Sequence, residues 1–324
     1  MYLKDKKIFL AGATGGVGAG ILQHLLRNYP DTRIKAAYSK TRPYIKDKKV
    51  EYVKADLRLQ RDCRRASFGC DCAIMTAANT SGARILKTEP WQQVNDNLTM
   101  NSQMLEAFYF NKVNRVVFVS SATVYQEFQG YIKEDQLDLN IDPHPAYMGI
   151  GWVMRYIEKL CKFWHQQGME IVIARATNPF GPYFKFNPKT SNFIPALIRK
   201  AVSKMDPFEI WGSPDVERDV LYVDDFACAI AMMLDNYGIK FDIFNVGSGT
   251  KTSVGDVAKL ALKYAEHSPK EIKYIQDKPT TIKFRALDCA KARDLLGWRP
   301  QYSAEQGIGE TVEWWIKHKD KWKK

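Results

Sequence analysis

Short apolar runs alternate with segments of helical periodicity through the first half of this chain. The apolar runs predict strands at 7–11, 33–38, 50–53, 72–77, 115–120 and 170–174. Apolar residues spaced by three and four predict helices at 16–28, 60–67, 91–111 and 146–167. Alternation of this kind predicts an α/β fold with a Rossmann-type, doubly wound parallel sheet, in which ligands bind beyond the carboxyl ends of the strands.

After about residue 178 the pattern becomes irregular and richer in Pro and Gly. Short helices are predicted near 193–204, 224–236, 253–266, 289–296 and 304–317. We therefore expect a first domain over residues 1–178 and a smaller C-terminal α/β lobe over residues 179–324. The boundary is approximate, because the chain can cross back between the two parts.

The first predicted strand runs directly into a glycine-rich turn, and an apolar helix follows. Gly12, Gly15 and Gly18 are spaced to permit a tight turn, a close approach of the backbone to a pyrophosphate, and close packing of helix on strand. Amide groups at a helix start favour bound phosphate. The sequence therefore predicts that the first domain binds a dinucleotide through this turn, with contacts from Gly12, Thr14, Gly15, Gly16, Val17 and Gly18.

The end of the second predicted strand bears on the choice of cofactor. An acid there would bind the ribose hydroxyls of NAD, but this chain has none; Ser39, Lys40 and Arg42 could instead hold a 2′-phosphate. NADP is therefore favoured over NAD, the alternative being that Lys40 and Arg42 are solvated loop charges. Asp56 and Leu57, after the third strand, are expected near the adenine, although a plain turn acid is the alternative for Asp56.

Composition narrows the class of protein. The 324 residues carry a net charge of +12, which suits an anionic ligand, and also nucleic acid or a membrane surface. The basic residues are spread out except at the terminal run 317–324, so we do not expect nucleic-acid binding. No apolar run approaches the ~20 residues of a membrane helix, and we expect a cytoplasmic protein. Six cysteines show no metal-binding spacing, so free thiols and no metal site are expected.

Further motifs carry chemistry-bearing residues. They are the strand end Val119–Tyr125, Tyr147 at the start of a long helix 26 residues after Ser121, the strand end Arg175–Pro182, and the stretch Glu217–Asp225. Together with the glycine-rich turn, Asn97 and the segment Leu296–Pro300, they resemble the extended short-chain dehydrogenase/reductase family over nearly the whole chain. That family contains nucleotide-sugar epimerases, dehydratases and reductases. The segments 77–83, 191–199 and Trp211-Gly212 resemble its GDP-fucose synthase branch.

The resemblance implies hydride exchange between a sugar carbon and the nicotinamide of NAD or NADP. Tyr147 would move the hydroxyl proton, which requires its phenol pKa to fall from about 10 toward neutral. Ser121 would hydrogen-bond the same oxygen, and Thr123 would contact the sugar. By the same resemblance, Ala77, Ala78, Asn97, Ser120 and Tyr147 would line the cofactor site. The nucleotide-diphosphate sugar would be held by Ser81, Thr123, Asn178, Asn192 and Arg218, with Arg218 on the diphosphate and Arg285 as a weaker second candidate.

Three departures from the family pattern reduce the number of reactions that this chain is expected to catalyse. The family carries a lysine four residues after the tyrosine, where this chain has Gly151; Arg155 could lean back to replace its charge. Thr123 and Asn192 stand where fucose synthases carry the cysteine and histidine of 3,5-epimerisation. Ala122 and Thr123 stand where 4,6-dehydratases carry Asp-Glu. A C4 epimerase or a 4-keto-sugar reductase remains, with GDP weakly favoured as the nucleotide.

The missing lysine also leaves open a function other than catalysis. Gly151 and the net charge of +12 are compatible with a non-catalytic dinucleotide-binding sensor, or with a basic RNA-binding protein of the same fold. The helices predicted at 91–111 and 146–167 commonly form a dimer interface in such families, so a homodimer is expected by resemblance.

Overall fold

The computed structural model describes residues 2–80, 89, 91–275 and 285–322. A seven-stranded sheet of order β12-β7-β5-β4-β1-β2-β3 forms the centre of the larger domain, and every neighbouring pair is parallel. Its strands are β1 (Lys7–Ala11), β2 (Arg33–Tyr38), β3 (Val50–Lys54), β4 (Cys72–Met75), β5 (Arg115–Ser121), β7 (Glu170–Ala176) and β12 (Phe241–Val246). The predicted Rossmann-type fold class is confirmed, and the strand order reverses between β1 and β4, where open α/β sheets bind ligands.

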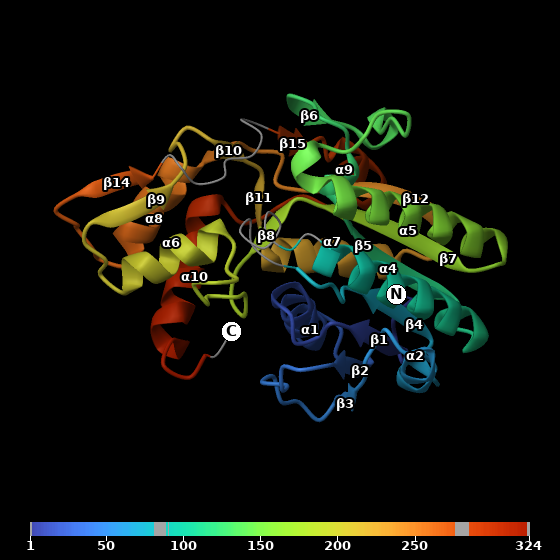
Figure 1. The fold of residues 1–324 in the computed structure, drawn as a ribbon. Coiled ribbons are helices and arrows are strands. Elements are labelled where there is room, and N and C mark those ends of the chain that lie inside the picture. The colour runs from blue at the N-terminus through green and yellow to red at the C-terminus, as the bar shows by residue number, and fades with distance from the viewer. Residues whose placement is uncertain (1, 81–88, 90, 276–284, 323–324) are drawn as a thin grey trace.

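Helices cover both faces of this sheet (Figure 1). One layer contains α1 (Gly16–Asn28), α7 (Val223–Asp235) and α9 (Ala290–Leu296), and the other contains α2 (Gln60–Ser67), α4 (Trp91–Phe110) and α5 (Met148–Gln166). In β1, Ile8 and Leu10 pack into the first core, whereas Phe9 and Ala11 pack into the second. The uninterrupted apolar run of β1 therefore reflects a strand buried on both faces.

The seventh strand, β12, was not among the predicted strands, and with it the chain crosses back to the sheet after residue 178. It pairs with β7, and α7 before it packs on α1, where the side chain of Val223 fills the space left by Gly20. The chain therefore leaves the sheet near residue 178 but returns to it with α7 and β12. The local sequence of β12 does not show which domain the strand belongs to, because an apolar strand has the same pattern in either domain.

The smaller lobe lies to one side of the sheet (Figure 1). Its helices are α6 (Phe193–Val202), α8 (Val254–Tyr264) and α10 (Ala304–His318). Short strand pairs complete it: β8 (Asn178–Phe180) with β11 (Val220–Tyr222), β9 (Phe208–Trp211) with β14 (Ile272–Ile275), and β10 (Glu217–Arg218) with β13 (Thr252–Ser253). A further pair, β6 (Gly130–Ile132) with β15 (Arg285–Leu287), lies beside the sheet. These strands were not predicted, since two to four residues carry too little periodicity.

The segment predicted as one helix at 146–167 has a different start. Residues Pro145–Tyr147 form the short 3-10 helix η3, and α5 begins only at Met148, with Tyr147 as its N-cap. His144 accepts a hydrogen bond from the backbone N–H of Ala146 (3.1 Å), which fixes the entry of the chain into the helix. Tyr147 therefore precedes the first turn of α5 as its N-cap residue and does not lie within that turn.

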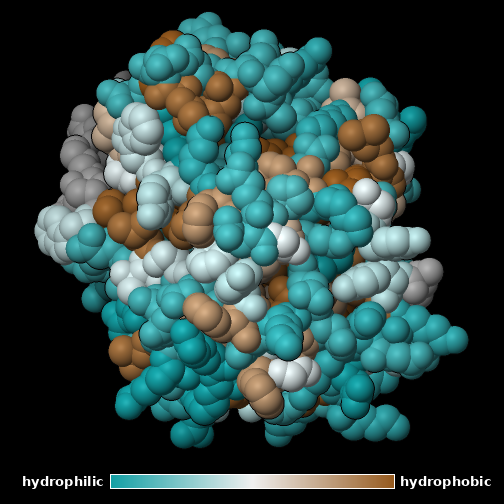
Figure 2. Space-filling view, turned by 90° about the vertical axis from the view of Figure 1, so that its right-hand side faces the viewer, coloured by the Kyte–Doolittle hydropathy of each residue, from teal (hydrophilic) through white to brown (hydrophobic). Residues whose placement is uncertain are grey.

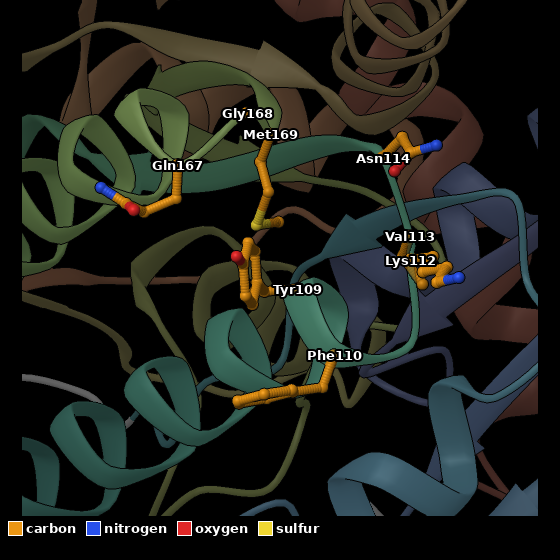
Figure 3. Close-up of a pocket in the computed structure, with 8 residues that line it drawn as sticks. All are labelled: Tyr109, Phe110, Lys112, Val113, Asn114, Gln167, Gly168 and Met169. Carbon is orange, nitrogen blue, oxygen red and sulfur yellow. The ribbon is translucent and has the colours of Figure 1, made fainter.

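A shallow cavity of about 370 Å³ lies where α4 and α5 end and β5 and β7 begin (Figure 3). Its lining includes Tyr109, Phe110 and Met169. It is at the amino edge of the sheet, opposite the edge where ligands bind in this class of fold, so it is not the candidate site. The face in Figure 2 is mainly hydrophilic with separate hydrophobic patches. Within the described ranges, no helix has the length and apolar content needed to cross a membrane.

Candidate active site

The glycine-rich turn between β1 and α1 requires residues that have no side chain. Gly12 has a φ of +79°, and a Cβ there would stand 2.8 Å from the Cα of Ala77. A Cβ at Gly18 would overlap the carbonyl oxygen of Gly12, so α1 can pack on the turn only without a side chain at that position. Gly15, the N-cap of α1, offers no side-chain acceptor to the helix amides, and the first helical turn contains no acid. This cradle fits a pyrophosphate, because the first amides of a helix need an outside partner.

The residues after β2 and β3 border the same edge. Ser39, Lys40 and Arg42 are all exposed, which leaves them open to a 2′-phosphate. The carboxylate of Asp56 accepts hydrogen bonds from Nε (3.0 Å) and Nη2 (2.8 Å) of Arg58, and these bonds lower the pKa of Asp56. Lys40 lies close enough to act on Asp56 in the same direction. The side chain of Leu57 is buried in the core beside α2, which leaves only its backbone for the predicted contact with the adenine.

The backbone after β4 forms the opposite wall of the turn. Ala77 touches Gly12, while the hydroxyl of Thr76 donates to the carbonyl oxygen of Ala11 (2.6 Å). Asn97 is buried; its Oδ1 accepts from the N–H of Asn79 (2.8 Å) and its Nδ2 donates to the carbonyl oxygen of Asn79 (3.0 Å). Both amide groups of Asn97 are thus occupied by backbone. We revise its predicted role from a cofactor contact to a residue that positions the wall containing Ala77 and Ala78.

The hydroxyls predicted for the chemistry lie at the end of β5 and the start of α5. The Ser121 hydroxyl accepts a hydrogen bond from the N–H of Thr123 (3.2 Å). The Thr123 hydroxyl is buried, and no hydrogen-bond partner for it exists among the residues that the structure describes. Tyr147 is half-buried, with its ring 5.9 Å from that of His144. Because Gly151, one helical turn beyond Tyr147, touches the backbone of Thr123, the start of α5 lies directly beside this strand end.

Position 151, where the family carries its lysine, has no room for a side chain. A Cβ at Gly151 would stand 2.6 Å from the carbonyl oxygen of Thr123 and 2.6 Å from the Cβ of Pro143. No larger side chain fits there unless the backbone moves. Our expectation that Arg155 replaces the ammonium is not supported either. Its guanidinium is buried and donates from Nε to the carbonyl oxygen of Val124 (2.6 Å) and from Nη1 to that of Ile141 (2.6 Å), so Arg155 holds the loop that precedes α5.

Ser120 belongs to a buried polar network rather than to an open site. Its hydroxyl donates to Oε1 of Glu158 on α5 (2.6 Å), and Glu158 also forms an ion pair with Arg175 on β7 (2.8 Å). Arg175 in turn donates to the hydroxyl of Tyr125 (2.9 Å). This network ties β5, α5 and β7 together beneath the strand end. The predicted cofactor contact of Ser120 is therefore not available to its side chain.

Arg218 reaches the same edge from the smaller lobe. It lies on β10 opposite Thr252, and its Nη1 donates to the carbonyl oxygen of Glu217 (2.7 Å). Burial lowers the pKa of Arg218, and an electrostatic interaction with Tyr147 acts in the opposite direction. Arg218 and Tyr147 are therefore within electrostatic range of each other across the two parts of the chain, whereas we had expected Arg218 only on the substrate diphosphate.

The backbone that carries Arg218 is held from several sides. Asp219 is fully buried; it accepts hydrogen bonds from the N–H (2.7 Å) and hydroxyl (2.8 Å) of Ser248, and burial raises its pKa. The side chain of Asn178 donates to the carbonyl oxygen of Asp219 (2.9 Å). Asn178 was predicted to line the sugar pocket, and the structure places it next to Arg218 as a residue that also positions it.

For the three other residues predicted to bind the substrate, the structure gives at most a position in the fold. Asn192 is exposed at the N-cap of α6. Arg285 begins β15, opposite Gly130. Ser81 lies outside the described residues.

Sequence reasoning missed Arg199, on α6. Its Nε is buried and has no hydrogen-bond partner in the described part of the chain, and burial lowers its pKa. A buried, unpartnered guanidinium nitrogen is a candidate for an anionic ligand. The signal was present in the sequence, because Arg199 ends the stretch 191–199 that carries the family resemblance, but a helical arginine reads as a solvated charge.

Comparison with known proteins agrees with this geometry. Residues 8–247 match the NAD dependent epimerase/dehydratase family. The chain is 26% identical over 331 residues to the probable GDP-L-fucose synthase 1 of Oryza sativa subsp. japonica, with 98% of this chain and 94% of the relative covered. In fold it is similar to the UDP-glucose 4-epimerase of Thermotoga maritima with UDP-glucose, at a TM-score of 0.83 and 20% identity, covering 96% and 99% of the two chains. The UDP-glucose 4-epimerase of Thermus thermophilus in complex with NAD gives a TM-score of 0.78 and 21% identity, covering 95% and 98%.

The fold and the family match identify an NAD(P)-dependent enzyme of the extended short-chain dehydrogenase/reductase type. The family match covers most of the sequence, and the chain belongs to the NAD dependent epimerase/dehydratase family.

Proposed function

We propose that this enzyme is a nucleotide-sugar epimerase or 4-keto-sugar reductase that transfers hydride at C4 of its substrate. The arrangement that carries this proposal packs the start of α5, with Tyr147 as its N-cap, against Thr123, and it brings Arg218 within electrostatic range of Tyr147. It joins a proton-transfer group from the larger domain with a diphosphate-binding cation from the smaller lobe. A nicotinamide dinucleotide, when bound, supplies or accepts the hydride. The glycine-rich turn would hold its pyrophosphate, and the accessible Ser39, Lys40 and Arg42 favour NADP.

Tyr147 exchanges the proton of the C4 hydroxyl as the hydride moves at the same carbon. Ser121 donates a hydrogen bond to that oxygen and stabilises its developing charge. The buried hydroxyl of Thr123, which the described chain leaves unpartnered, gains a sugar hydroxyl as its partner. Position 151 cannot carry the family lysine, so the phenol of Tyr147 has no ammonium one helical turn beyond it.

Thr123 and Asn192 argue against epimerisation at C3 and C5, because neither side chain can exchange a carbon-bound proton at neutral pH. Ala122 and Thr123 argue against dehydration in the same way, since neither supplies a carboxyl group. Hydride transfer at C4 needs no second acid–base pair. The resemblance to fucose synthases favours a GDP-sugar as the substrate.

Native mass spectrometry of the freshly purified protein, with identification of released molecules, tests this proposal first. Retained dinucleotide supports an epimerase that recycles its cofactor, and an empty protein that takes up NADPH supports a reductase. Turnover is then assayed by mass spectrometry on GDP- and UDP-sugars. Arg218→Ala is expected to lose nucleotide-sugar affinity, while unchanged affinity contradicts the proposed diphosphate contact. Dinucleotide binding without turnover on any sugar nucleotide would favour the non-catalytic alternative, and no dinucleotide binding at all contradicts the proposal.

We also propose that α4 and α5 form the interface of a homodimer. The two helices pack against each other and expose large apolar side chains, including Trp91 on α4 and Tyr156 and Phe163 on α5. Aromatic residues of this kind are enriched in protein interfaces. Sedimentation of the double variant Tyr156→Glu, Phe163→Glu is expected to give a monomer where the unmodified protein gives a dimer. A dimer in both, or a monomer in both, contradicts this interface.

A further inference from the structure

A short strap of the smaller lobe, residues Tyr183–Phe186, crosses to the glycine-rich turn. It follows β8 and the turn at Gly181-Pro182. The ring of Phe184 lies against Gly16, so closely that a Cβ at Gly16 would stand 2.5 Å from the ring. Gly16 therefore needs to be glycine because of this long-range contact, in addition to any role in the turn itself.

Aromatic packing and hydrogen bonds hold the strap in place. The ring of Tyr183 stacks on that of Tyr44, which follows β2, with 4.9 Å between centroids and an angle of 7° between the planes. Tyr44 donates from its hydroxyl to the carbonyl oxygen of Thr14 in the glycine-rich turn (3.0 Å). Trp322 donates from Nε1 to the carbonyl oxygen of Phe184 (3.0 Å). The strap is thus anchored both to the turn and to the C-terminal segment.

Lys185 occupies the middle of the strap. Its ammonium donates to the carbonyl oxygen of Thr80, in the wall that follows β4. The side chain is half-buried, and burial lowers the pKa of Lys185 without a contribution from any charged neighbour of the described chain. An ammonium has three N–H donors, and the hydrogen bonds that the structure describes for it use one. A desolvated cation without a counter-charge favours an anion beside it.

The two ends of this contact define where such an anion would lie. Phe184 touches the start of α1, and Lys185 reaches the wall after β4, which itself meets the turn where Ala77 contacts Gly12. We propose that Lys185 binds the pyrophosphate of the dinucleotide from the side opposite the glycine-rich turn. The inference rests on the proposed function, since it requires a bound dinucleotide. It adds a cation from the smaller lobe to a pyrophosphate site otherwise built from backbone amides.

The affinity for NADP⁺ and NAD⁺, measured by isothermal titration calorimetry, tests this proposal. Lys185→Met keeps the length of the side chain and removes its charge, and we expect the dissociation constant to rise about 10- to 100-fold, as for loss of a charge-assisted hydrogen bond. Lys185→Arg is expected to restore most of the affinity, because it retains the charge. Lys189→Met, at an exposed lysine in the same loop, is the matched control and should bind like the unmodified protein.

GDP serves as the second probe, because a nucleotide sugar also carries a diphosphate. If Lys185→Met weakens GDP binding and leaves NADP⁺ and NAD⁺ binding unchanged, the lysine serves the substrate and the proposal is overturned as stated. Unchanged affinity for all three ligands overturns it as well. If the unmodified protein binds no dinucleotide, the proposed function fails and the inference fails with it. If the unmodified protein and the Lys185 variants bind the dinucleotides equally well, the proposed function stands and only this inference fails.

Thermal unfolding without ligand separates binding from a structural role. Removing a desolvated charge should leave the melting temperature of Lys185→Met equal to or above that of the unmodified protein. A clear decrease would show that the bond to Thr80 is what matters, and it would count against a ligand-binding role.

Discussion

The carbonyl oxygen of Thr123 lies 2.6 Å from the point where a Cβ of residue 151 would stand, so the approach of these two residues depends on Gly151. The contact joins the short 3-10 turn Ala122–Val124, which follows β5, to the first turn of α5. It also removes the space in which other members of the family are expected to hold a lysine. The loss of that lysine is therefore part of the packing of this site, and a lysine could not be restored without moving the backbone.

Adding a side chain at position 151 should destabilise the protein. Glycine to alanine inside a helix normally stabilises by about 1 kcal/mol, but in Gly151→Ala the new methyl group would overlap the Thr123 carbonyl and Pro143. We expect a net loss of about 1–3 kcal/mol in the free energy of unfolding, measured by urea denaturation, and a larger loss with no gain of activity for Gly151→Lys. Gly149→Ala is the control: its Cβ would meet only the side chain of Val94, so the loss should be smaller. Equal effects at both positions would contradict the packing argument.

Tyr147→Phe tests the proposed proton transfer. Removing the phenol oxygen should lower kcat about 10²- to 10⁴-fold, the usual range for loss of a general acid–base group, while the dissociation constant for the dinucleotide stays close to that of the unmodified enzyme. Tyr274→Phe, at an exposed tyrosine on β14 of the smaller lobe, should change neither quantity. Steady-state kinetics and calorimetry give the two numbers. Full activity of Tyr147→Phe would transfer the role of acid–base group to another residue.

Arg115 should contribute to stability without a part in the chemistry. Its guanidinium is fully buried at the start of β5 and donates to the carbonyl oxygens of Met233 (2.6 Å) and Leu234 (2.7 Å) at the end of α7. Arg115→Met leaves these carbonyls without their donor and Glu170 without its buried partner, so we expect a loss of about 3–5 kcal/mol in unfolding free energy. Arg293→Met, at an exposed arginine, should change stability by less than about 1 kcal/mol. Chemical denaturation distinguishes the two, and a small effect at Arg115 would contradict its role as a helix cap.

Asp224 predicts a pH dependence of stability. Burial alone would raise the pKa of Asp224, but the hydrogen bond with His24 and the charge of Arg27 outweigh it, so the pKa of the folded state is lowered. An aspartate whose pKa falls on folding stabilises the protein above its unfolded pKa of about 3.9, and this contribution disappears as the pH falls through the folded value.

The variant Asp224→Asn measures that contribution. It should be less stable than the unmodified protein at pH 7 by about 1 kcal/mol, because the carboxylate is only partly shielded from solvent. The difference should shrink as the pH is lowered from 5 toward 3 in a series of urea denaturations. Asp31→Asn, at an exposed position, gives the baseline. A difference that does not change with pH would show that the interaction does not depend on the carboxylate charge.

Local signals predicted the first six strands of the sheet and the helices between them, because these signals act within a few residues. The apolar run of β1, the glycines at 12, 15 and 18 and the apolar stripe of α1 specify a strand, a turn and a helix through backbone sterics and side-chain periodicity. Helix 60–67 has its predicted bounds in the structure. The hydroxyls at the end of β5 were found for the same reason, since the carboxyl ends of parallel strands meet at one edge.

The roles of several polar residues could not be predicted in this way. Asn97, Ser120 and Arg155 all carry groups that suit a ligand, and the structure uses those groups for buried backbone or for Glu158. Whether a polar side chain faces a ligand or the core depends on which unsatisfied groups the fold brings next to it, and those groups lie far away in the sequence.

The sequence by itself determined the fold class, the position of the glycine-rich turn and the set of residues from which the site is drawn, because periodicity and backbone conformation are local properties. Only the tertiary structure decided that β12 returns to the sheet, that Thr123 closes position 151, that Arg218 comes within electrostatic range of Tyr147, and that Lys185 crosses to the wall after β4. Each of these joins residues far apart in the chain, where packing and desolvation, rather than local pattern, determine which groups meet.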